Sequence, residues 1–360
     1  MADQARTVRN KQVILVSYPK DWVIEDNLRI EETDIHLSLK PGCGHVLLQT
    51  LWASVDPYLR WRMQESKEGL YAQPFQLGKP IVVRAVSKVI ASDHQEIHVG
   101  EFVAGPISLG EYALVEGGQG LWKVDPNLAP LSYYLGLLGA PGLTAWAGLN
   151  LIGEPKPGDE FFVSAAAGAV GLVVGQLAKL KGCRVVGSVG SDDKFSIYIY
   201  IYIFQVELLK KEFGYDDAFN YKKEVNWDAT LGKYFPQGID IYFENVGGRM
   251  LEAVLNHINL NGRIPVCGML SSYNQEWTEQ EGVRNLQNIL EKCVKMQGFI
   301  VSHHFHHLST YIQEVAGYLK EGKIKYKEHV TEGLENFAKS FIGMLKGANF
   351  GKVVVHISDP

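Results

Sequence analysis

A glycine-containing turn between apolar segments is the feature that most constrains how this chain folds. Residues 160–191 read EFFVSAAAGAVGLVVGQLAKLKGCRVVGSVGS. A short apolar run precedes the turn, and residues 172–180 have the spacing of a buried helix. Gly182 ends that helix, and residues 184–187 open a second apolar strand. This order predicts the βαβ unit that binds dinucleotides.

The turn consists of small residues, which let the backbone approach a pyrophosphate. The start of the following helix adds free N–H groups and a partial positive charge, which favour an anion. We therefore expect a dinucleotide to bind at Ala166, Ala167, Gly168, Ala169, Val170 and Gly171. The alternative is a helix end and a helix start that lie close together by chance.

Composition limits the class of protein. A chain of 360 residues with 46% hydrophobic and 21% charged residues is typical of a globular protein with two domains. A net charge of −5 argues against a general nucleic-acid binder. The four cysteines form no CxxC pair, which favours a reducing compartment. With no secretory signal and no long apolar run, we expect a cytoplasmic protein without membrane or nucleic-acid partners.

The two parts of the chain have different patterns. Up to about residue 131, short runs rich in Val, Ile and aromatic residues alternate with Gly and Pro, which predicts a β-rich domain. From residue 160 onward, strands and helices alternate, which predicts an α/β fold with a parallel sheet covered on both faces. Further strands are expected at residues 238–243, 262–267 and 298–301, each next to small or polar residues.

One segment interrupts this pattern. Residues 195–205 read FSIYIYIYIFQ, a tyrosine–isoleucine alternation of β period that is apolar on both faces. An AT dinucleotide repeat read in frame encodes alternating Ile and Tyr, so a sequence accident is one interpretation. A hydrophobic flap or a dimer contact is another. The segment is too short to span a membrane.

Several motifs outside that segment resemble those of one known family. They are VDPYLR at residues 55–60, GAPGLTA at 139–145, DAFNYK at 217–222, DIYFENVGG at 240–248 and GRIPVCGMLSSY at 262–273. Together they resemble the zinc-independent medium-chain dehydrogenase/reductases, in particular plant-type alkenal double-bond reductases and animal prostaglandin reductases. The resemblance implies a GroES-like substrate domain over residues 1–142 and a doubly wound Rossmann domain over 143–309. Residues 310–360 would return to the first domain, and the protein would form a homodimer.

The resemblance also implies a reaction. NADPH would reduce the C=C bond of α,β-unsaturated aldehydes and ketones by hydride transfer to the β-carbon, with 2-alkenals, phenylpropenals and benzalacetones as substrates. One alternative is an NADPH quinone reductase of the same fold. Another is a nucleotide-binding protein whose catalysis is impaired by the segment at residues 195–205.

The predicted tip of the second strand favours NADPH over NADH. NAD sites usually carry an acid about 20 residues after the glycines. Here small residues at 187–191 are followed by Lys194, which suits a 2′-phosphate and is used for it in the resembled family. Asp192 and Asp193 would repel a phosphate that they faced, but acidic residues are also common in the first turn of a helix.

Other cofactor contacts are implied by the resemblance. Tyr221 would contact the adenosine phosphate region, and Asn245 would lie along the cofactor. The residues expected around the nicotinamide are Cys267, Gly268, Met269, Phe299, Ile300, Val301 and Asn349. Buried packing is the alternative for Cys267 and Met269, and a plain turn is the alternative for Asn245.

Tyr273 is the predicted catalytic residue. A phenol that hydrogen-bonds the substrate carbonyl oxygen stabilises the negative charge that builds there during hydride addition. A tyrosine that only packs at the rim is the alternative. By resemblance Tyr58 shapes the carbonyl pocket. Arg84 stands where the family commonly has a tyrosine, so it either binds an acidic substrate group or points to solvent.

We expect no metal. The GHE-type motif and the four-cysteine lobe of zinc-dependent relatives are absent from the sequence. His303 and His307 have a ligand-like i,i+4 spacing, but no acidic residue accompanies them at the usual distance. The nucleophile-elbow and P-loop patterns are also absent from the sequence.

Overall fold

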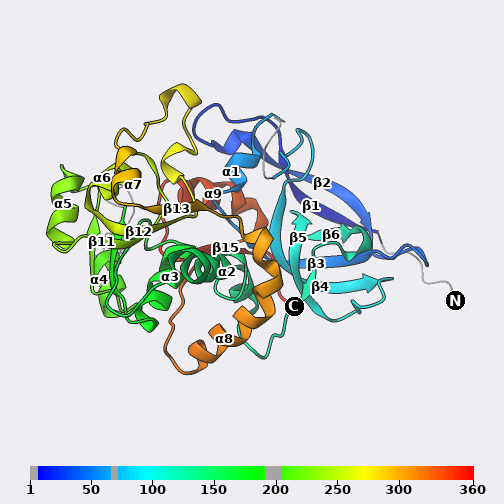
Figure 1. The fold of residues 1–360 in the computed structure, drawn as a ribbon. Helices are drawn as coiled ribbons and strands as arrows, with labels where there is room; N and C mark the ends of the chain where they lie inside the picture. Colours follow the sequence, from blue (N-terminus) through cyan, green and yellow to red (C-terminus); the bar gives the residue numbers. More distant parts are fainter. Residues whose placement is uncertain (1–6, 66–71, 191–203) are drawn as a thin grey trace. The chain divides into compact units, whose positions relative to one another are not determined.

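The computed structural model describes residues 7–65, 72–190 and 204–360, which form two compact units. The β-rich unit consists of Met1–Leu135, Glu328–Lys346 and Val353–Pro360, and the Rossmann unit consists of Gly136–Lys327 and Gly347–Lys352. The predicted combination of a β-rich domain and a Rossmann domain is confirmed. Figure 1 shows the ribbon of each unit.

The β-rich unit is built on a mostly antiparallel sheet. Its strand order is β14-β15-β3-β4-β5-β7, and β6 also pairs with β3. These strands are β3 (Val46–Ser54), β4 (Val82–Ser92), β5 (Phe102–Ser108), β6 (Tyr112–Val115), β7 (Trp122–Lys123), β14 (Glu328–Glu332) and β15 (Lys352–His356). A separate antiparallel pair is formed by β1 (Thr7–Leu15) and β2 (Leu28–His36).

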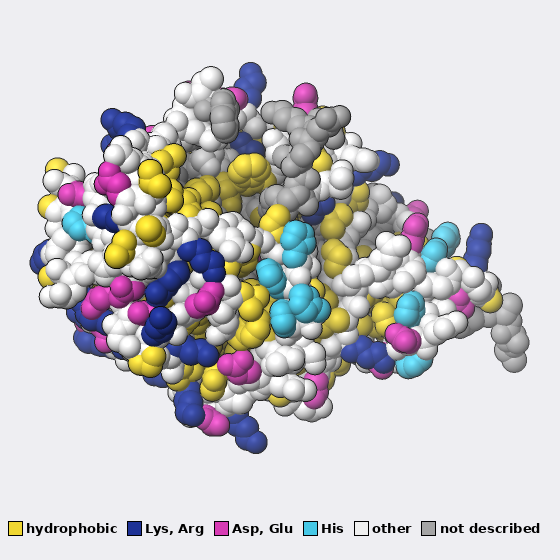
Figure 2. Space-filling model, in the orientation of Figure 1, with side chains coloured by type: hydrophobic (Ala, Val, Ile, Leu, Met, Phe, Trp, Pro, Cys, Tyr) yellow, Lys and Arg dark blue, Asp and Glu magenta, His cyan; other side chains and the backbone are white. Residues whose placement is uncertain are grey.

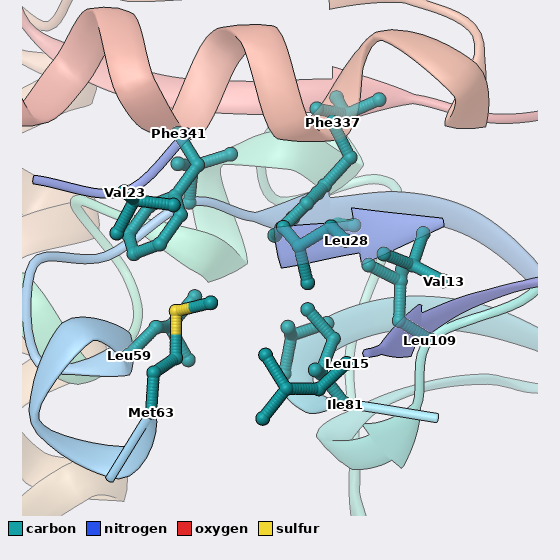
Figure 3. Close-up of a cluster of buried hydrophobic side chains, with 14 of the residues drawn as sticks. Val13, Leu15, Val23, Leu28, Leu59, Met63, Ile81, Leu109, Phe337 and Phe341 are labelled. Atoms are coloured by element: carbon teal, nitrogen blue, oxygen red, sulfur yellow. The ribbon is translucent and has the colours of Figure 1, made fainter. Parts of the chain in front are cut away.

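A buried cluster joins distant parts of the chain within the β-rich unit. Figure 3 shows Phe337 and Phe341, which belong to α9 (Phe337–Leu345). They point toward Leu59 and Met63, around the short helix α1 (Leu59–Arg62), and toward the first strands. The two phenylalanines are four residues apart and therefore lie on one helix face. Burying each stabilises the fold by about 1.5–3 kcal/mol. This cluster explains why Glu328–Lys346 belongs to the first unit.

The Rossmann unit is built on a sheet whose recorded strand pairs are all parallel. The strand order is β10-β9-β8-β11-β12-β13. The strands are β8 (Glu160–Val163), β9 (Arg184–Val189), β10 (Asp217–Asn220), β11 (Ile239–Phe243), β12 (Ile258–Val266) and β13 (Lys295–Gly298). The order reverses between β8 and β11, and this switch point is where open α/β sheets bind their ligands.

Helices bury both faces of this sheet. Phe162, Val186 and Tyr242 pack in one cluster with α5 (Trp227–Tyr234) and α6 (Gly248–His257). Phe161 and Val185 point to the opposite face, because side chains alternate along a strand, and they are equally buried. On that side α3 (Ala169–Leu180) packs against α2 (Ala140–Ala147). Burial on both faces explains the near-continuous apolar strands.

The last part of the chain is divided between the units. Helix α8 (Leu308–Lys320) lies in the Rossmann unit, where the Tyr311 hydroxyl donates to the Leu137 carbonyl and the Trp146 indole donates to Glu314 at 3.0 Å. Helix α9 lies in the β-rich unit, and Gly347–Lys352 returns to the Rossmann unit. The chain thus passes from one unit to the other after Leu135, Lys327, Lys346 and Lys352, whereas the sequence predicts boundaries after residues 142 and 309.

Two elements differ from the sequence prediction. The strand expected at residues 298–301 is wrong, because the ladder with β12 ends at the pair Val266 and Gly298 and a 3₁₀ helix follows over Val301–His307. Helix α4 (Phe204–Lys211) includes the end of the unusual segment at residues 195–205. The remaining α-helix is α7 (Gln287–Glu291). Within the described ranges, no helix is long and apolar enough to cross a bilayer.

Candidate functional site

The turn between β8 and α3 lies at the switch point and leaves no room for side chains. A Cβ atom built on Gly171 would lie 2.5 Å from the Ala165 carbonyl oxygen and 2.7 Å from the Ala166 Cα. Ala165 itself has a positive φ of 50°, which turns the chain sharply after the strand. Glycine at position 171 therefore allows the helix to start directly against the turn.

This turn fits the pyrophosphate of a dinucleotide. Gly168 caps α3 without a side-chain hydrogen bond, and Gly168, Ala169 and Val170 are partly exposed. The first N–H groups of a helix and its dipole attract an anion, and small residues let the anion approach. Ala166, Ala167 and Gly171 are buried beneath the turn. The structure therefore places this turn at the switch point of the sheet, and its contact with a dinucleotide stays a prediction.

A strap from the end of the chain crosses the same turn. We call Gly347–Lys352 the C-terminal strap. The Gly351 N–H donates to the Ala167 carbonyl at 2.8 Å, and the Gln205 side chain in α4 donates to the Asn349 carbonyl at 3.2 Å. These bonds bring Asn349 close to the cofactor turn, although Asn349 lies far from it in the sequence.

The tip of β9 holds Tyr221. A Cβ atom on Gly190 would lie 2.2 Å from the Tyr221 ring, so the ring packs directly on the backbone of the strand tip. Burial raises the pKa of Tyr221, so its hydroxyl stays protonated and available as a donor. Lys194 and residues 195–203 lie outside the described residues, and the predicted phosphate contact of Lys194 stays a prediction.

Asn245 joins the two strands that flank the switch point. Its side-chain amide donates to the Ser164 carbonyl at 2.7 Å, and its backbone N–H donates to the Ser164 hydroxyl at 3.0 Å. Ser164 directly follows β8, and Asn245 follows β11. The hydrogen bond from its side-chain amide therefore positions Asn245 at the rim of the sheet. The predicted role of Asn245 along the cofactor stays a prediction.

Sequence reasoning missed the buried carboxylate beside Asn245. Glu244 is fully buried, and its Oε1 accepts hydrogen bonds from the Val246 and Gly247 N–H groups at 2.6 and 2.9 Å and from the Tyr242 hydroxyl at 2.7 Å. Burial raises the pKa of Glu244, although the two N–H groups act in the opposite direction. The sequence feature that could have revealed Glu244 is an acidic residue at the end of the apolar strand IDIYF.

The tip of β12 brings the predicted catalytic tyrosine next to Asn245. A Cβ atom on Gly268 would lie 3.3 Å from both the Tyr273 hydroxyl and the Asn245 carbonyl oxygen. Met269 lies close to the turn after β11, because its Sδ would be 2.5 Å from a Cβ atom built on Gly247. Burial raises the pKa of Cys267 to about 12, so this thiol stays protonated and is no nucleophile at neutral pH.

Phe299 packs inside the Rossmann unit near the end of β11. Its ring centroid is 6.4 Å from that of Phe243, and a Cβ atom on Gly148 would lie 2.7 Å from the ring. Ile300 and Val301 follow it, partly buried, at the start of the 3₁₀ helix. Their predicted contacts with the nicotinamide stay predictions.

The histidines of that 3₁₀ helix lie together. Histidine side chains gather on the face drawn in Figure 2, and the rings of His306 and His307 are 4.0 Å apart. Burial and the neighbouring histidines lower the pKa of His304. Among the described residues, no group of three or more His, Cys, Asp or Glu could hold a metal ion.

Two predicted substrate residues lie in the β-rich unit. Tyr58 occupies the N-cap of α1 and packs, partly buried, against the cluster of Figure 3. Arg84 lies on β4 opposite Pro106 and is partly buried. Their contacts with a substrate stay predictions.

Family models and known proteins match this chain along most of its length. Residues 11–124 match a model described as the N-terminal domain of oxidoreductase, and residues 169–317 match one described as zinc-binding dehydrogenase. The chain is 45% identical over 354 residues to 2-alkenal reductase (NADP(+)-dependent) of Nicotiana tabacum, which covers 98% of this chain and 99% of that protein. It is 42% identical over 353 residues to (+)-pulegone reductase of Mentha piperita, with the same coverage.

A solved structure shows the same similarity in three dimensions. The crystal structure of CurA from Vibrio vulnificus in complex with NADPH superimposes with a TM-score of 0.86 and is 39% identical. The alignment covers 98% of this chain and all of that chain, 100%. The similarity to CurA therefore extends over both units and is not confined to the nucleotide-binding part.

Proposed function

The chain belongs to the medium-chain dehydrogenase/reductase family of NADP-dependent oxidoreductases, and from this premise we propose that it reduces the C=C bond of α,β-unsaturated aldehydes and ketones. The observation that carries the proposal is the position of Tyr273, whose hydroxyl lies against Gly268 and beside Asn245 at the rim of the Rossmann sheet. A phenol at this rim is suited to a substrate that develops negative charge on a carbonyl oxygen.

NADPH is the cofactor. Ala166 to Gly171 would hold its pyrophosphate at the start of α3, and Tyr221 would lie at the adenosine end beside Gly190. When bound, NADPH supplies the hydride that adds to the β-carbon of the substrate. The chain's own residues then have to orient the enal or enone and stabilise its oxygen.

Tyr273 would donate its hydroxyl proton in a hydrogen bond to the substrate carbonyl oxygen. This bond strengthens as the oxygen becomes an enolate, so it lowers the barrier more than it tightens substrate binding. The α-carbon then takes its proton from water. Tyr58 would shape the carbonyl pocket, and Arg84 would select among substrates.

The substrate range belongs to the same proposal. The relatives include a 2-alkenal reductase and a pulegone reductase. Each of these names refers to an unsaturated carbonyl compound as the substrate. We infer 2-alkenals, phenylpropenals and benzalacetones as substrates, in a cytoplasmic enzyme. These compounds all carry a carbonyl oxygen conjugated to the C=C bond, which is the group that Tyr273 would stabilise.

We also propose a homodimer built through the Rossmann unit. Strand β13 is the outer strand of the described sheet, and its Lys295, Gln297 and Gly298 are exposed. Leu286 and Leu290 nearby are 51% and 79% exposed. An exposed strand edge beside exposed leucines favours association with another chain. Light scattering of the purified protein tests this, and a monomer at micromolar concentration would contradict it.

The reaction is tested by mixing the protein with NADPH and a 2-alkenal, a benzalacetone or a quinone. We expect loss of the reduced-nicotinamide absorbance with the first two, and mass spectrometry should identify the saturated carbonyl product. Rapid turnover of the quinone with no reduction of the enal would contradict the proposal in favour of a quinone reductase. An inactive protein that still binds NADPH would contradict both.

The role of Tyr273 is tested with Tyr273→Phe. Removing the hydroxyl should lower kcat about tenfold or more, because a hydrogen-bond donor to the developing oxyanion is lost. The affinity for NADPH, measured by fluorescence, should stay nearly unchanged. Tyr318→Phe, which removes a hydroxyl bonded to Glu314 in the same unit, serves as the matched control. A wild-type kcat in Tyr273→Phe would refute the assignment.

A further inference from the structure

Glu244 is a buried carboxylate with no part in the proposed reaction. One of its oxygens is crowded with donors, whereas Oε2 is buried and has no hydrogen-bond partner among the described residues. Burying a carboxylate is costly, and well-packed apolar residues often serve stability as well or better. This unequal use of the two oxygens indicates a role in fixing local geometry.

The side chain of Glu244 fixes the turn that begins α6. Its Oε1 accepts from consecutive backbone N–H groups, those of Val246 and Gly247, and from the Tyr242 hydroxyl. Gly247 has a φ of 77°, a conformation that favours glycine and gives the turn its shape. The carboxylate therefore stabilises a backbone that would otherwise leave buried donors unpaired.

The same turn supports the loop that carries Tyr273. Carbonyl oxygens of residues 244–246 accept hydrogen bonds from this loop: Glu244 from Cys267 and Gly268 at 2.9 and 3.1 Å, Asn245 from Leu270 at 3.0 Å, and Val246 from Ser271 at 3.0 Å. The Tyr273 hydroxyl lies against Gly268 in that loop. A shift of the turn would therefore move the loop and the hydroxyl with it.

We propose that Glu244 is a positioning residue, which fixes the turn at residues 245–248 and through it places the Tyr273 hydroxyl at the tip of β12. The inference rests on the proposed function, because Tyr273 is the group that it positions. Glu244 contacts neither substrate nor cofactor in this proposal. Its contribution to catalysis passes through Tyr273.

The test is a double-mutant cycle in the full-length protein, with kcat for a 2-alkenal and affinity for NADPH as readouts. Glu244→Ala should lower kcat about tenfold, because the misplaced hydroxyl no longer meets the oxyanion. In the Tyr273→Phe background the same substitution should lower kcat less than about threefold, because the hydroxyl is already absent. Glu244→Gln retains an oxygen for the two N–H groups and should keep kcat within about threefold of wild type.

A destabilising control separates positioning from general loss of stability. Leu209→Ala removes a fully buried side chain from α4 in the same unit, outside the buried cluster that contains Tyr242. It should lower the melting temperature and leave kcat of the folded fraction unchanged. If Glu244→Ala does not fold, the cycle is made with Tyr242→Phe, which removes one donor to the carboxylate. This variant should lower kcat in the wild-type background and leave it nearly unchanged in the Tyr273→Phe background.

The outcomes distinguish the two proposals. Equal losses of kcat in the wild-type and Tyr273→Phe backgrounds would overturn the positioning role, as would full kcat in a folded Glu244→Ala protein. A wild-type protein that binds NADPH but reduces no enal would overturn the proposed function, and the positioning role with it. Non-additive losses confined to the wild-type background support both.

Discussion

The two turns at the switch point of the Rossmann sheet are built in opposite ways. The turn after β8 uses Ala and Gly, and its shape depends on the absence of atoms near Gly171. The turn after β11 is held by polar side chains, with Glu244 and Ser164 buried at its base. One turn makes space for an anion, and the other holds side chains in position.

This difference predicts different sensitivities. The β8 turn should tolerate the loss of side-chain polarity but not an added methyl group, because its neighbours are backbone atoms that cannot move aside. The β11 turn should tolerate small changes in volume but not the loss of a hydrogen-bond acceptor, because buried donors would be left unpaired. A set of variants at both turns can break or sharpen this contrast.

Gly171→Ala should have the largest effect. Its Cβ would meet the Ala165 carbonyl oxygen at 2.5 Å, whereas the Cβ of the control Gly168→Ala would meet the same oxygen at 3.2 Å. We expect Gly171→Ala to lower the free energy of unfolding by about 1–3 kcal/mol and NADPH affinity about 100-fold. Gly168→Ala should lose much less of both. Thermal melting and fluorescence titration provide the measurements, and equal effects of the two variants would refute the steric explanation.

Ser164→Ala should come next, because it removes one of the two hydrogen bonds that link Ser164 to Asn245. The Ser164 hydroxyl accepts from the Asn245 N–H at 3.0 Å and lies 3.0 Å from the Tyr242 hydroxyl. Leaving a buried N–H unpaired costs about 1–3 kcal/mol of stability, and this should appear in urea denaturation. Ser188→Ala is a suitable control, since its buried hydroxyl has no hydrogen-bond partner in the described part of the chain. An equal loss in the control would argue that packing, not hydrogen bonding, is decisive.

The charge of Glu244 gives the β11 turn a pH dependence that the β8 turn lacks. Burial raises the pKa of Glu244 above its ordinary value of 4.5. The folded state therefore holds this proton more tightly than the unfolded state, so the stabilisation is complete below about pH 4.5 and is lost as pH rises through the folded pKa. The stability of wild type minus that of Glu244→Gln should therefore fall as pH rises across this window.

Urea denaturation of both proteins at several pH values measures this difference. Other titrating groups, including the histidines after Phe299, are present in both proteins, so their contributions cancel in the subtraction. A difference that is constant with pH would show that Glu244 has the same proton affinity in the folded and unfolded states. A difference that rises with pH would reverse the predicted sign.

The two turns also show which parts of the site can be predicted from sequence. The β8 turn was predicted because local spacing of Gly and Ala encodes it, between an apolar strand and an apolar helix. The polar cluster under the β11 turn was not, because Ser164 and Tyr242 contribute to it from different strands that only the sheet brings together. The strand at residues 298–301 was misplaced because Phe299 packs on Phe243 rather than extending the ladder.

The smallest expected effect lies where the C-terminal strap meets the β8 turn. Gln205 is buried, and its amide donates to the Asn349 carbonyl at 3.2 Å, while Gly351 bonds the turn directly. Gln205→Ala would loosen only one end of the strap, so we expect KM for NADPH to rise about two- to fivefold with kcat unchanged, since a neutral hydrogen bond contributes about 0.5–1.5 kcal/mol. Lys211→Ala on the exposed side of the same helix is the control. A lowered kcat in Gln205→Ala would mean that the strap acts on catalysis as well as on cofactor binding, and that the β8 turn, like the β11 turn, depends on a polar side chain.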